Sequence, residues 1–220
     1  RFYIINAANA RPFNIAIPGT KIKVIGSDNG AYEKAFFTDS VTLGPSERAI
    51  IDVLFGKAGA YELQNKTPDK TYVLGTITTN TNAATTSYAM QFDTLQKNDD
   101  VEKSVAPFRQ YMDKTPDKNL QLTIDMGGPM LSMPGMGHNE HIMPDGIRMS
   151  GSMTSQSADG IEWDDTNTIM NQMSTTNSVQ WKIVDQDTKK ENMDIDWTFK
   201  KDTPVKIRIY NDSNSMHPMQ

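Results

Sequence analysis

The chain reads Gly44-Pro45-Ser46-Glu47-Arg48-Ala49-Ile50-Ile51-Asp52-Val53-Leu54-Phe55, which is a turn followed by a run rich in β-branched and apolar residues. This order is typical of a strand that begins after a tight turn. Similar short runs, separated by turn residues, recur over the first ninety residues or so: Phe2–Ile5, Phe13–Ile17, Lys21–Ile25 and Tyr61–Leu63. Such spacing predicts an antiparallel β-sandwich or barrel.

The second half of the chain returns to this pattern after a polar interruption. Residues 93–118 are polar and charged and contain Pro107 and Pro116, a composition typical of a linker. Strand-like runs then follow at 119–124, 179–184, 194–199 and 205–210. No stretch keeps a helical period over more than three turns. The sequence therefore predicts an all-β protein with two domains, at residues 1–92 and 119–220.

Strand-like runs also lie at or near both ends of the chain, at Arg1–Asn6 and Val205–Asp212. A strand needs neighbours in a sheet, so we expect each domain to be an incomplete barrel with open edges. The missing strands are expected to come from other segments of the same protein or from a second copy of this chain.

The composition excludes several classes of chemistry. The chain contains no cysteine, which rules out disulfides, Cys-ligated zinc, iron–sulfur clusters and cysteine nucleophiles within it. The formal net charge of −5 offers no basic surface for phosphate contacts, so no nucleic-acid partner is expected. No apolar run reaches the roughly 18 residues of a spanning helix, so no membrane span is expected.

Methionine is concentrated at residues 126–153, which hold seven of the fourteen methionines. Gly and Pro residues throughout this segment disfavour regular structure and predict an exposed loop or a short broken helix. Thioether sulfur favours Cu(I), and imidazole binds either copper oxidation state. We therefore expect a Cu(I) site in this loop, formed by Met130, Met133, Met136, His138 and His141. The alternative is that flexible methionines fill an irregular hydrophobic surface or lid.

Acidic residues give weaker signals. Glu162, Asp164 and Asp165 flank a tryptophan and could bind a cation or a basic substrate, although a solvated acidic loop explains them as well. The stretch 185–187 lacks the glycine and the later acidic ligands of a calcium loop, which favours a hairpin turn. The charged residues at 47, 48 and 52 are interpreted as structural. No nucleotide-binding or serine-hydrolase motif occurs.

Three blocks of the first half resemble the middle cupredoxin-like domain of three-domain multicopper oxidases. They are Arg1-Phe2-x-Ile4-x-Asn6-Ala7-x-Asn9-Ala10-Arg11, Ile25-Gly26-Ser27-Asp28-Asn29-Gly30 and Leu43-Gly44-Pro45-Ser46-Glu47-Arg48-Ala49-Ile50-Ile51-Asp52-Val53. Later segments resemble the start of the third domain of bacterial laccase-like and copper-efflux oxidases: Trp181-x-Ile183, Asn192-Met193-Asp194 and Val205–Asp212 with Ser215-Met216-His217-Pro218. The resemblance implies two incomplete cupredoxin-like Greek-key barrels.

The resemblance also implies a parent enzyme that oxidises phenols, aromatic amines or Cu(I) and reduces dioxygen to water. Such oxidases hold a mononuclear copper through His, Cys and usually Met, and a trinuclear cluster through eight His. With three His and no Cys, this chain cannot build either centre. The copper centres are therefore expected on other segments of the same oxidase, and the chain alone is expected to be inactive. An extracytoplasmic compartment is favoured by the resemblance.

His217 begins a partial copper motif. His217-Pro218-Met219 matches the start of the family pattern His-Pro-x-His-x-His-Gly, but Gln220 stands where the second His belongs. His217 is therefore either a neighbour of the motif or part of a degenerate copy. An alternative function is a non-catalytic copper-binding or scavenging module that uses only the Met/His loop. A β-sandwich adhesion or carbohydrate-binding module would leave the methionines unexplained.

Overall fold

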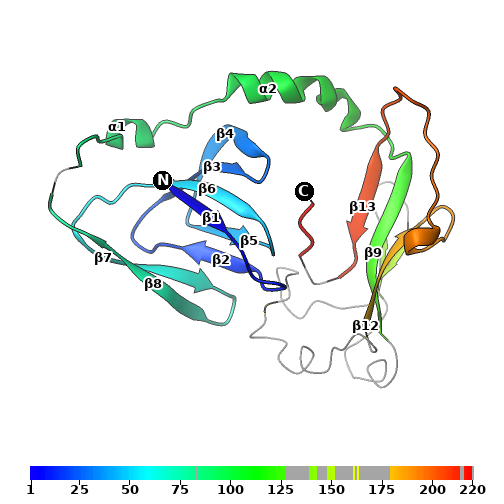
Figure 1. Ribbon diagram of the computed structural model, residues 1–220, viewed down its shortest axis with the longest axis horizontal. Helices are drawn as coiled ribbons and strands as arrows, with labels where there is room; N and C mark the ends of the chain where they lie inside the picture. Colours follow the sequence, from blue (N-terminus) through cyan, green and yellow to red (C-terminus); the bar gives the residue numbers. More distant parts are fainter. Residues whose placement is uncertain are drawn as a thin grey trace. The chain divides into compact units, whose positions relative to one another are not determined.

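The computed structural model describes residues 1–82, 84–126, 139–142, 148–151, 161, 163, 179–213 and 216–219. The chain divides into two compact units. Unit 1 comprises Arg1–Pro107 and Met216–Gln220, and unit 2 comprises Phe108–Ser215. Both are built mainly from β-strands (Figure 1), so the all-β prediction is confirmed.

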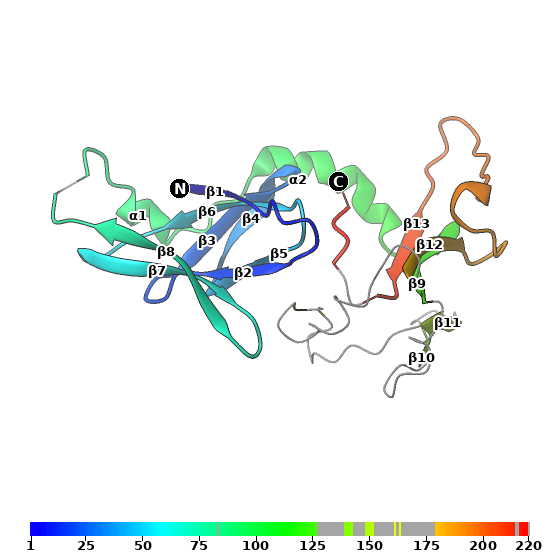
Figure 2. The same cartoon turned by 60° about the horizontal axis from the view of Figure 1, so that its bottom comes forward.

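Unit 1 is a sandwich of two four-stranded sheets (Figure 2). The first sheet has the order β1-β6-β3-β4, with strands at Phe2–Ile5, Arg48–Val53, Ile22–Ser27 and Gly30–Thr38. The second has the order β5-β2-β7-β8, with strands at Ser40–Leu43, Phe13–Ala16, Gly59–Lys66 and Thr71–Thr79. All pairs are antiparallel, and the chain passes repeatedly from one sheet to the other, as Greek-key sandwiches do.

The core of unit 1 lies between the two sheets. Its buried cluster draws on both sheets, with Ile22, Val24, Ala49 and Ile51 from the first and Ile15 and Leu43 from the second. Ile22 and Val24 alternate with Lys23 along β3, so successive side chains point to opposite faces of the sheet. The alternation that predicted this strand therefore also determines which of its side chains enter the core.

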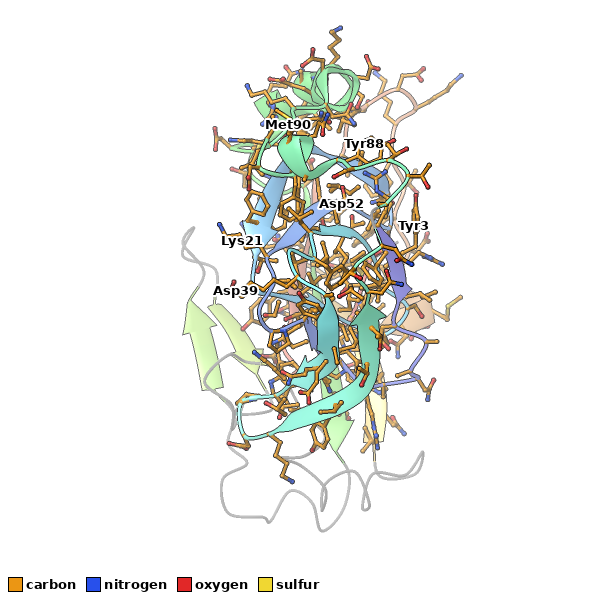
Figure 3. All side chains as sticks on the ribbon, turned by 90° about the vertical axis from the view of Figure 1, so that its left-hand side faces the viewer. Tyr3, Lys21, Asp39, Asp52, Tyr88 and Met90 are labelled. Carbon is orange, nitrogen blue, oxygen red and sulfur yellow. The ribbon has the colours of Figure 1, made fainter. Side chains whose placement is uncertain are left out.

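The outer face of β3 is covered by a segment that follows β8. The short helix α1 (Ala89–Phe92) leaves Met90 and the adjoining Tyr88 exposed (Figure 3). Its last carbonyls face the buried Lys23, whose Nζ donates to the carbonyl oxygens of Gln91, Phe92 and Thr94 at 3.2, 3.1 and 2.7 Å. One ammonium group thus donates to three carbonyls at and just after the C-terminus of α1.

Residues 96–98 then pair with the edge of β4. Ala35 N donates to the Gln96 carbonyl at 3.2 Å, and Asn98 N donates to the Glu33 carbonyl at 2.7 Å. Asn98 also caps helix α2 (Asp99–Val105), whose Val101 N–H it accepts. Residues 93–118, which the sequence predicted as a linker, thus contain α2 and the 3₁₀ helix η1 (Ala106–Tyr111).

Unit 2 contains a three-stranded sheet of order β12-β9-β13, with strands at Val179–Asp185, Lys118–Met126 and Ile207–Asn211. The central β9 is antiparallel to β12 and parallel to β13. A hairpin of β10 (Asn139–Ile142) and β11 (Arg148–Gly151) also belongs to this unit. Three of the four strands predicted for this half are therefore present, within two residues of the expected bounds.

The fourth prediction, a strand at 194–199, is wrong. The chain forms the 3₁₀ turn η3 (Asn192–Asp194) and then continues without regular pairing among the described residues. Side chains explain the difference, because Asn192 Oδ1 accepts the Ile183 N–H at 2.9 Å and the Trp197 indole donates to Asp185 at 2.9 Å. These contacts hold the segment against the end of β12 as a loop, in which the aromatic ring is anchored by its N–H.

In the sheet of unit 2, large apolar side chains on one face are half-exposed, whereas polar side chains on the other face are buried. The register places four large apolar side chains on one face, and they are 42 to 45% exposed: Trp181, Ile183, Ile207 and Ile209. On the opposite face, Asn119 and Gln121 are buried, and Gln121 Nε2 donates to Asp212 at 2.9 Å. These half-exposed apolar side chains form a candidate contact surface on unit 2.

Candidate functional site

The three sequence blocks meet in the first sheet of unit 1, where charged side chains join them. Arg1 and Asp52, from the first and third blocks, form a two-point ion pair with distances of 2.8 and 3.0 Å (Nε to Oδ1 and Nη2 to Oδ2). The hydrogen bond from Arg1 lowers the pKa of Asp52 below its usual value. Asp28 of the second block accepts from both the backbone N–H and the guanidinium of Arg48, at 3.0 and 3.1 Å.

Asn6 connects the first block to the turn before β6. Its side-chain amide donates to the Leu43 carbonyl at 3.1 Å, and its backbone exchanges hydrogen bonds with Ser46 and Glu47. Within the turn, the Glu47 carboxylate accepts the Gly44 N–H at 2.6 Å. The structural interpretation of Glu47, Arg48 and Asp52 is confirmed, because each hydrogen-bonds to a neighbouring strand or turn.

The segment Met216–Met219 belongs to unit 1 and lies against the same turn. A Cβ atom added at Gly44 would lie 2.9 Å from Pro218 Cγ and 3.2 Å from Met216 Cβ, so only glycine allows this approach. His217 is partly buried here, and burial lowers its pKa below 6.5. The imidazole is therefore neutral at physiological pH, which is the form that binds a metal.

This contact leads to a prediction. Replacing Gly44 by alanine should displace Met216–Met219 and expose His217, so the pKa of His217 should rise toward 6.5 and the free energy of unfolding of unit 1 should fall by about 1 kcal/mol. The measurement is an NMR titration of the His217 ring protons. Gly56→Ala is the matched control, because nothing lies within 4 Å of a Cβ at that position. If the pKa of His217 is the same in Gly44→Ala and in the wild type, the packing of Met216–Met219 on Gly44 does not bury His217.

The predicted Cu(I) residues are placed only in part. Met130, Met133, Met136 and His138 lie outside the described residues, as do Glu162, Asp164 and Asp165. The prediction that 126–153 is a loop or broken helix is wrong at β10 and β11, which pair as antiparallel strands. Their register sets His141 on β10 directly opposite Met149 on β11. Met149 was counted among the clustered methionines, but its pairing with His141 could not be predicted, since no sequence pattern fixes the register of two strands whose buried face is unknown.

The described residues do not fit the copper centres of the resembling oxidases. Among them, no three His, Cys, Asp or Glu side chains lie close enough together to hold one metal ion. The full sequence, with no Cys and three His, also lacks the thiolate and imidazoles that these centres need. None of the described helices combines the length and the apolar character that crossing a membrane requires.

Comparison with known proteins finds distant likenesses among solved structures, and no match elsewhere. No family model and no curated protein matches the chain. Among solved structures, a multicopper oxidase from Campylobacter jejuni, described as a metallo-oxidase, matches with 21% sequence identity and a TM-score of 0.41. The match covers 60% of this chain and 27% of that structure.

Proposed function

We propose that this chain is part of a multicopper oxidase that oxidises phenols, aromatic amines or Cu(I) and reduces dioxygen to water. The observation that supports this most directly is the way unit 1 joins the three blocks that resemble the oxidases. Ion pairs and hydrogen bonds link Arg1 to Asp52, Asp28 to Arg48 and Asn6 to the turn at 43–47. These motifs therefore act as one structural unit, the scaffold of a cupredoxin-like sandwich, and not as a catalytic centre.

The copper centres of the proposed enzyme lie on other segments of the same oxidase. Those segments also supply the cover for the apolar face of unit 2, where Trp181, Ile183, Ile207 and Ile209 are half-exposed. His217, whose pKa is lowered by burial, is proposed to lie close to the first copper motif of the third domain.

The Met-rich segment 126–153 is proposed to bind Cu(I) as a substrate, and Glu162, Asp164 and Asp165 to orient cationic substrates. The donors Met130, Met133, Met136, His138 and His141 are soft or borderline ligands suited to Cu(I). The pairing of His141 with Met149 across the hairpin supports this assignment, since it brings an imidazole-bearing and a thioether-bearing residue into register.

A triple substitution tests the Cu(I) site. Replacing Met130, Met133 and Met136 together by leucine should weaken Cu(I) binding by about tenfold or more, because leucine keeps the side-chain volume and removes the sulfur donor. Affinity is measured by competition with a chromogenic Cu(I) chelator. The matched control replaces the exposed Met90, Met112 and Met193, which lie outside the segment. Equal affinity of both triple variants would reject the site.

Oxygen uptake distinguishes the proposed oxidase from a simple copper-binding module. A chain without cysteine could also form such a module. The chain alone, loaded with copper, should consume no dioxygen in the presence of a phenol, since it cannot assemble the blue-copper thiolate site. Uptake should appear only when the Cys- and His-bearing segments of the parent are present. A parent sequence without these segments would favour the binding module.

A further inference from the structure

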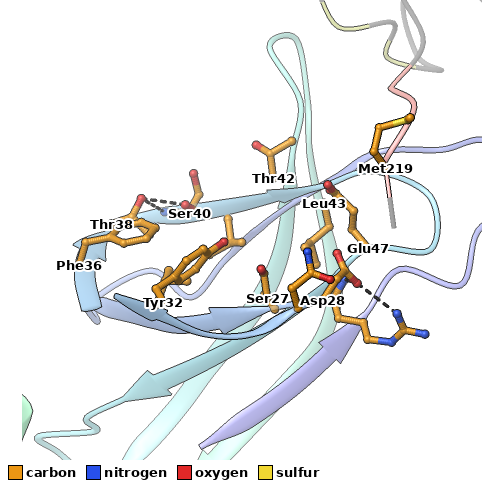
Figure 4. A pocket seen from close by; sticks show the side chains of 15 residues that line it. Ser27, Asp28, Tyr32, Phe36, Thr38, Ser40, Thr42, Leu43, Glu47 and Met219 are labelled. Carbon is orange, nitrogen blue, oxygen red and sulfur yellow. Dashed lines mark hydrogen bonds and ion pairs between the residues drawn. The ribbon is translucent and has the colours of Figure 1, made fainter. Parts of the chain in front are cut away.

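Unit 1 has a groove between the edge strands of its two sheets. The groove encloses about 390 Å³ and is bordered by β4 of the first sheet and β5 of the second (Figure 4). Pockets that bind small molecules begin at about 300 Å³. Its floor is the apolar core, through Val24 and Leu43. The groove is thus an open side of the sandwich, where the core reaches the surface.

Aromatic rings on β4 form one wall. The register pairs Phe36 with Val24 and Thr38 with Ile22, so Phe36 is on the face of β4 that carries the core. Phe36 is nevertheless 45% exposed, and the Tyr32 ring, 5.8 Å from it, is 39% exposed. Figure 4 shows both rings inside the groove. Core-facing aromatic rings that remain exposed leave room for an apolar side chain from outside.

The backbone edge of β5 forms the other wall. All four residues of β5 line the groove, although successive side chains in a strand point to opposite faces. The groove therefore runs along one edge of β5; among the described strands, β5 pairs with β2 alone, along its other edge. Asn14 turns its N–H away from β5, toward Asn65 on β7 at 2.8 Å, and Asn14 is the partner of Thr42. Antiparallel geometry then turns the Thr42 N–H and C=O outward, to the groove.

Part of the segment Met216–Met219, which forms no helix, already lies at one end of the groove. Met219 lines the groove, and the adjoining Pro218 packs on Gly44, the residue directly after β5. The same end carries Glu47 and the Asp28–Arg48 ion pair, which together give a charge of −1. An occupant with acidic side chains at this end is therefore disfavoured.

We infer that this groove binds an extended peptide from a separate polypeptide by strand addition to β5. The peptide backbone pairs with Thr42, and an apolar side chain lies against Tyr32 and Phe36. Edge strands attract such partners because their outer hydrogen-bonding groups are unused by the sheet. This site is independent of the proposed copper function, and either can hold without the other.

The test uses the full chain without copper and the peptide acetyl-Lys-Thr-Val-Thr-Val-Thr-Lys-amide. The control peptide has proline in place of the first valine, acetyl-Lys-Thr-Pro-Thr-Val-Thr-Lys-amide. In ¹⁵N NMR titrations, the first peptide should give saturable shifts at β5 and slow the hydrogen exchange of the Thr42 amide by about tenfold or more. Phe36→Ala should weaken binding by about fivefold. Val73→Ala, on the exposed face of edge strand β8, should not change it.

Three results would overturn the inference: no saturable binding, equal binding of the proline peptide, or shifts at β1 and β8 in place of β5. Protection of Thr42 that rises with protein concentration in the absence of peptide would identify a second copy as the occupant and would also reject a separate polypeptide. Circular dichroism of Phe36→Ala checks that the variant is folded. If it is not, Tyr32→Ala gives the same comparison from the neighbouring ring.

Discussion

Replacing Asp185 by alanine should lower the free energy of unfolding of unit 2 by about 3 kcal/mol, because it leaves buried donors without an acceptor. Asp185 is 1% exposed and accepts hydrogen bonds from the Trp197 indole at 2.9 Å and the Thr188 hydroxyl at 2.8 Å. It also accepts the backbone N–H groups of Asp187 and Thr188. The carboxylate thus fixes the turn after β12 and anchors the loop that carries Trp197.

Tryptophan fluorescence during urea unfolding measures this effect selectively. The three tryptophans of the chain, Trp163, Trp181 and Trp197, all belong to unit 2, so their emission reports on that unit alone. Asp187→Ala is the matched control, since Asp187 is exposed and the substitution keeps its backbone N–H. We expect the control to change stability by less than about 0.5 kcal/mol. Equal midpoints for the two variants would show that the Asp185 network does not stabilise unit 2.

Asp185 also predicts a pH dependence. Burial alone would raise its pKa, but the hydrogen bonds from Trp197, Thr188 and Asp187 outweigh burial and lower the pKa from 3.8 to about 2. A carboxylate whose pKa is lower in the folded state stabilises the fold above its unfolded pKa. The contribution of about 2 kcal/mol should therefore be present at neutral pH and be lost as the pH falls from about 4 to 2. The difference in stability between wild type and Asp185→Ala should shrink over that range.

Replacing Lys23 by methionine should release the segment 88–98 from the first sheet of unit 1. Methionine preserves the length of the side chain but leaves the carbonyls of Gln91, Phe92 and Thr94 without their shared donor. Hydrogen bonds from a charged donor are each worth about 1.5–3 kcal/mol, and water can rescue part of the loss, so we expect a net destabilisation of about 2 to 3 kcal/mol.

Hydrogen exchange of residues 88–98 is the measurement for this variant, since local release precedes global unfolding. Lys21→Met is the control, because Lys21 is exposed and its Nζ lies 5.8 Å from the Phe37 ring centroid without comparable hydrogen bonds among those described. Lys23→Met with wild-type exchange in 88–98 would mean that the Phe37–Phe92 ring contact, with centroids 5.4 Å apart, is enough to hold the segment.

The local alternation of apolar and polar residues predicted some strands but not others. β3 and β6 were predictable because their inward side chains alternate regularly with outward ones. β4 was not, because Glu33 and Lys34 interrupt its apolar pattern and its middle pairs with residues 96–98, a partner more than sixty residues away. The segment 194–199 looked like a strand by composition, yet Trp197 is held by Asp185, a tertiary contact that no periodicity reveals.

In the candidate sites, too, features set by local sequence could be predicted, and features set by contacts between distant residues could not. The charged residues of the turn before β6 could be assigned a structural role, because turn chemistry is local. The packing of Met216 and Pro218 against Gly44 could not be predicted, since it joins residues more than 170 positions apart. The groove beside β5 was also invisible in the sequence, because it arises from where two sheets end and not from any motif.

Unit 1 is assembled from two pieces of chain, and the 108 residues of unit 2, Phe108–Ser215, lie between them in the sequence. A ribosome adding roughly 5–20 residues per second takes about 5–20 s to make the intervening residues. All six side chains of the buried core cluster precede residue 52, so the sandwich can close around its core while Met216–Met219 is still unmade. During that interval the surface at Gly44 and the Leu43 end of the groove stand open on the nascent chain, accessible to chaperones and to neighbouring strands in a way that the finished protein does not allow.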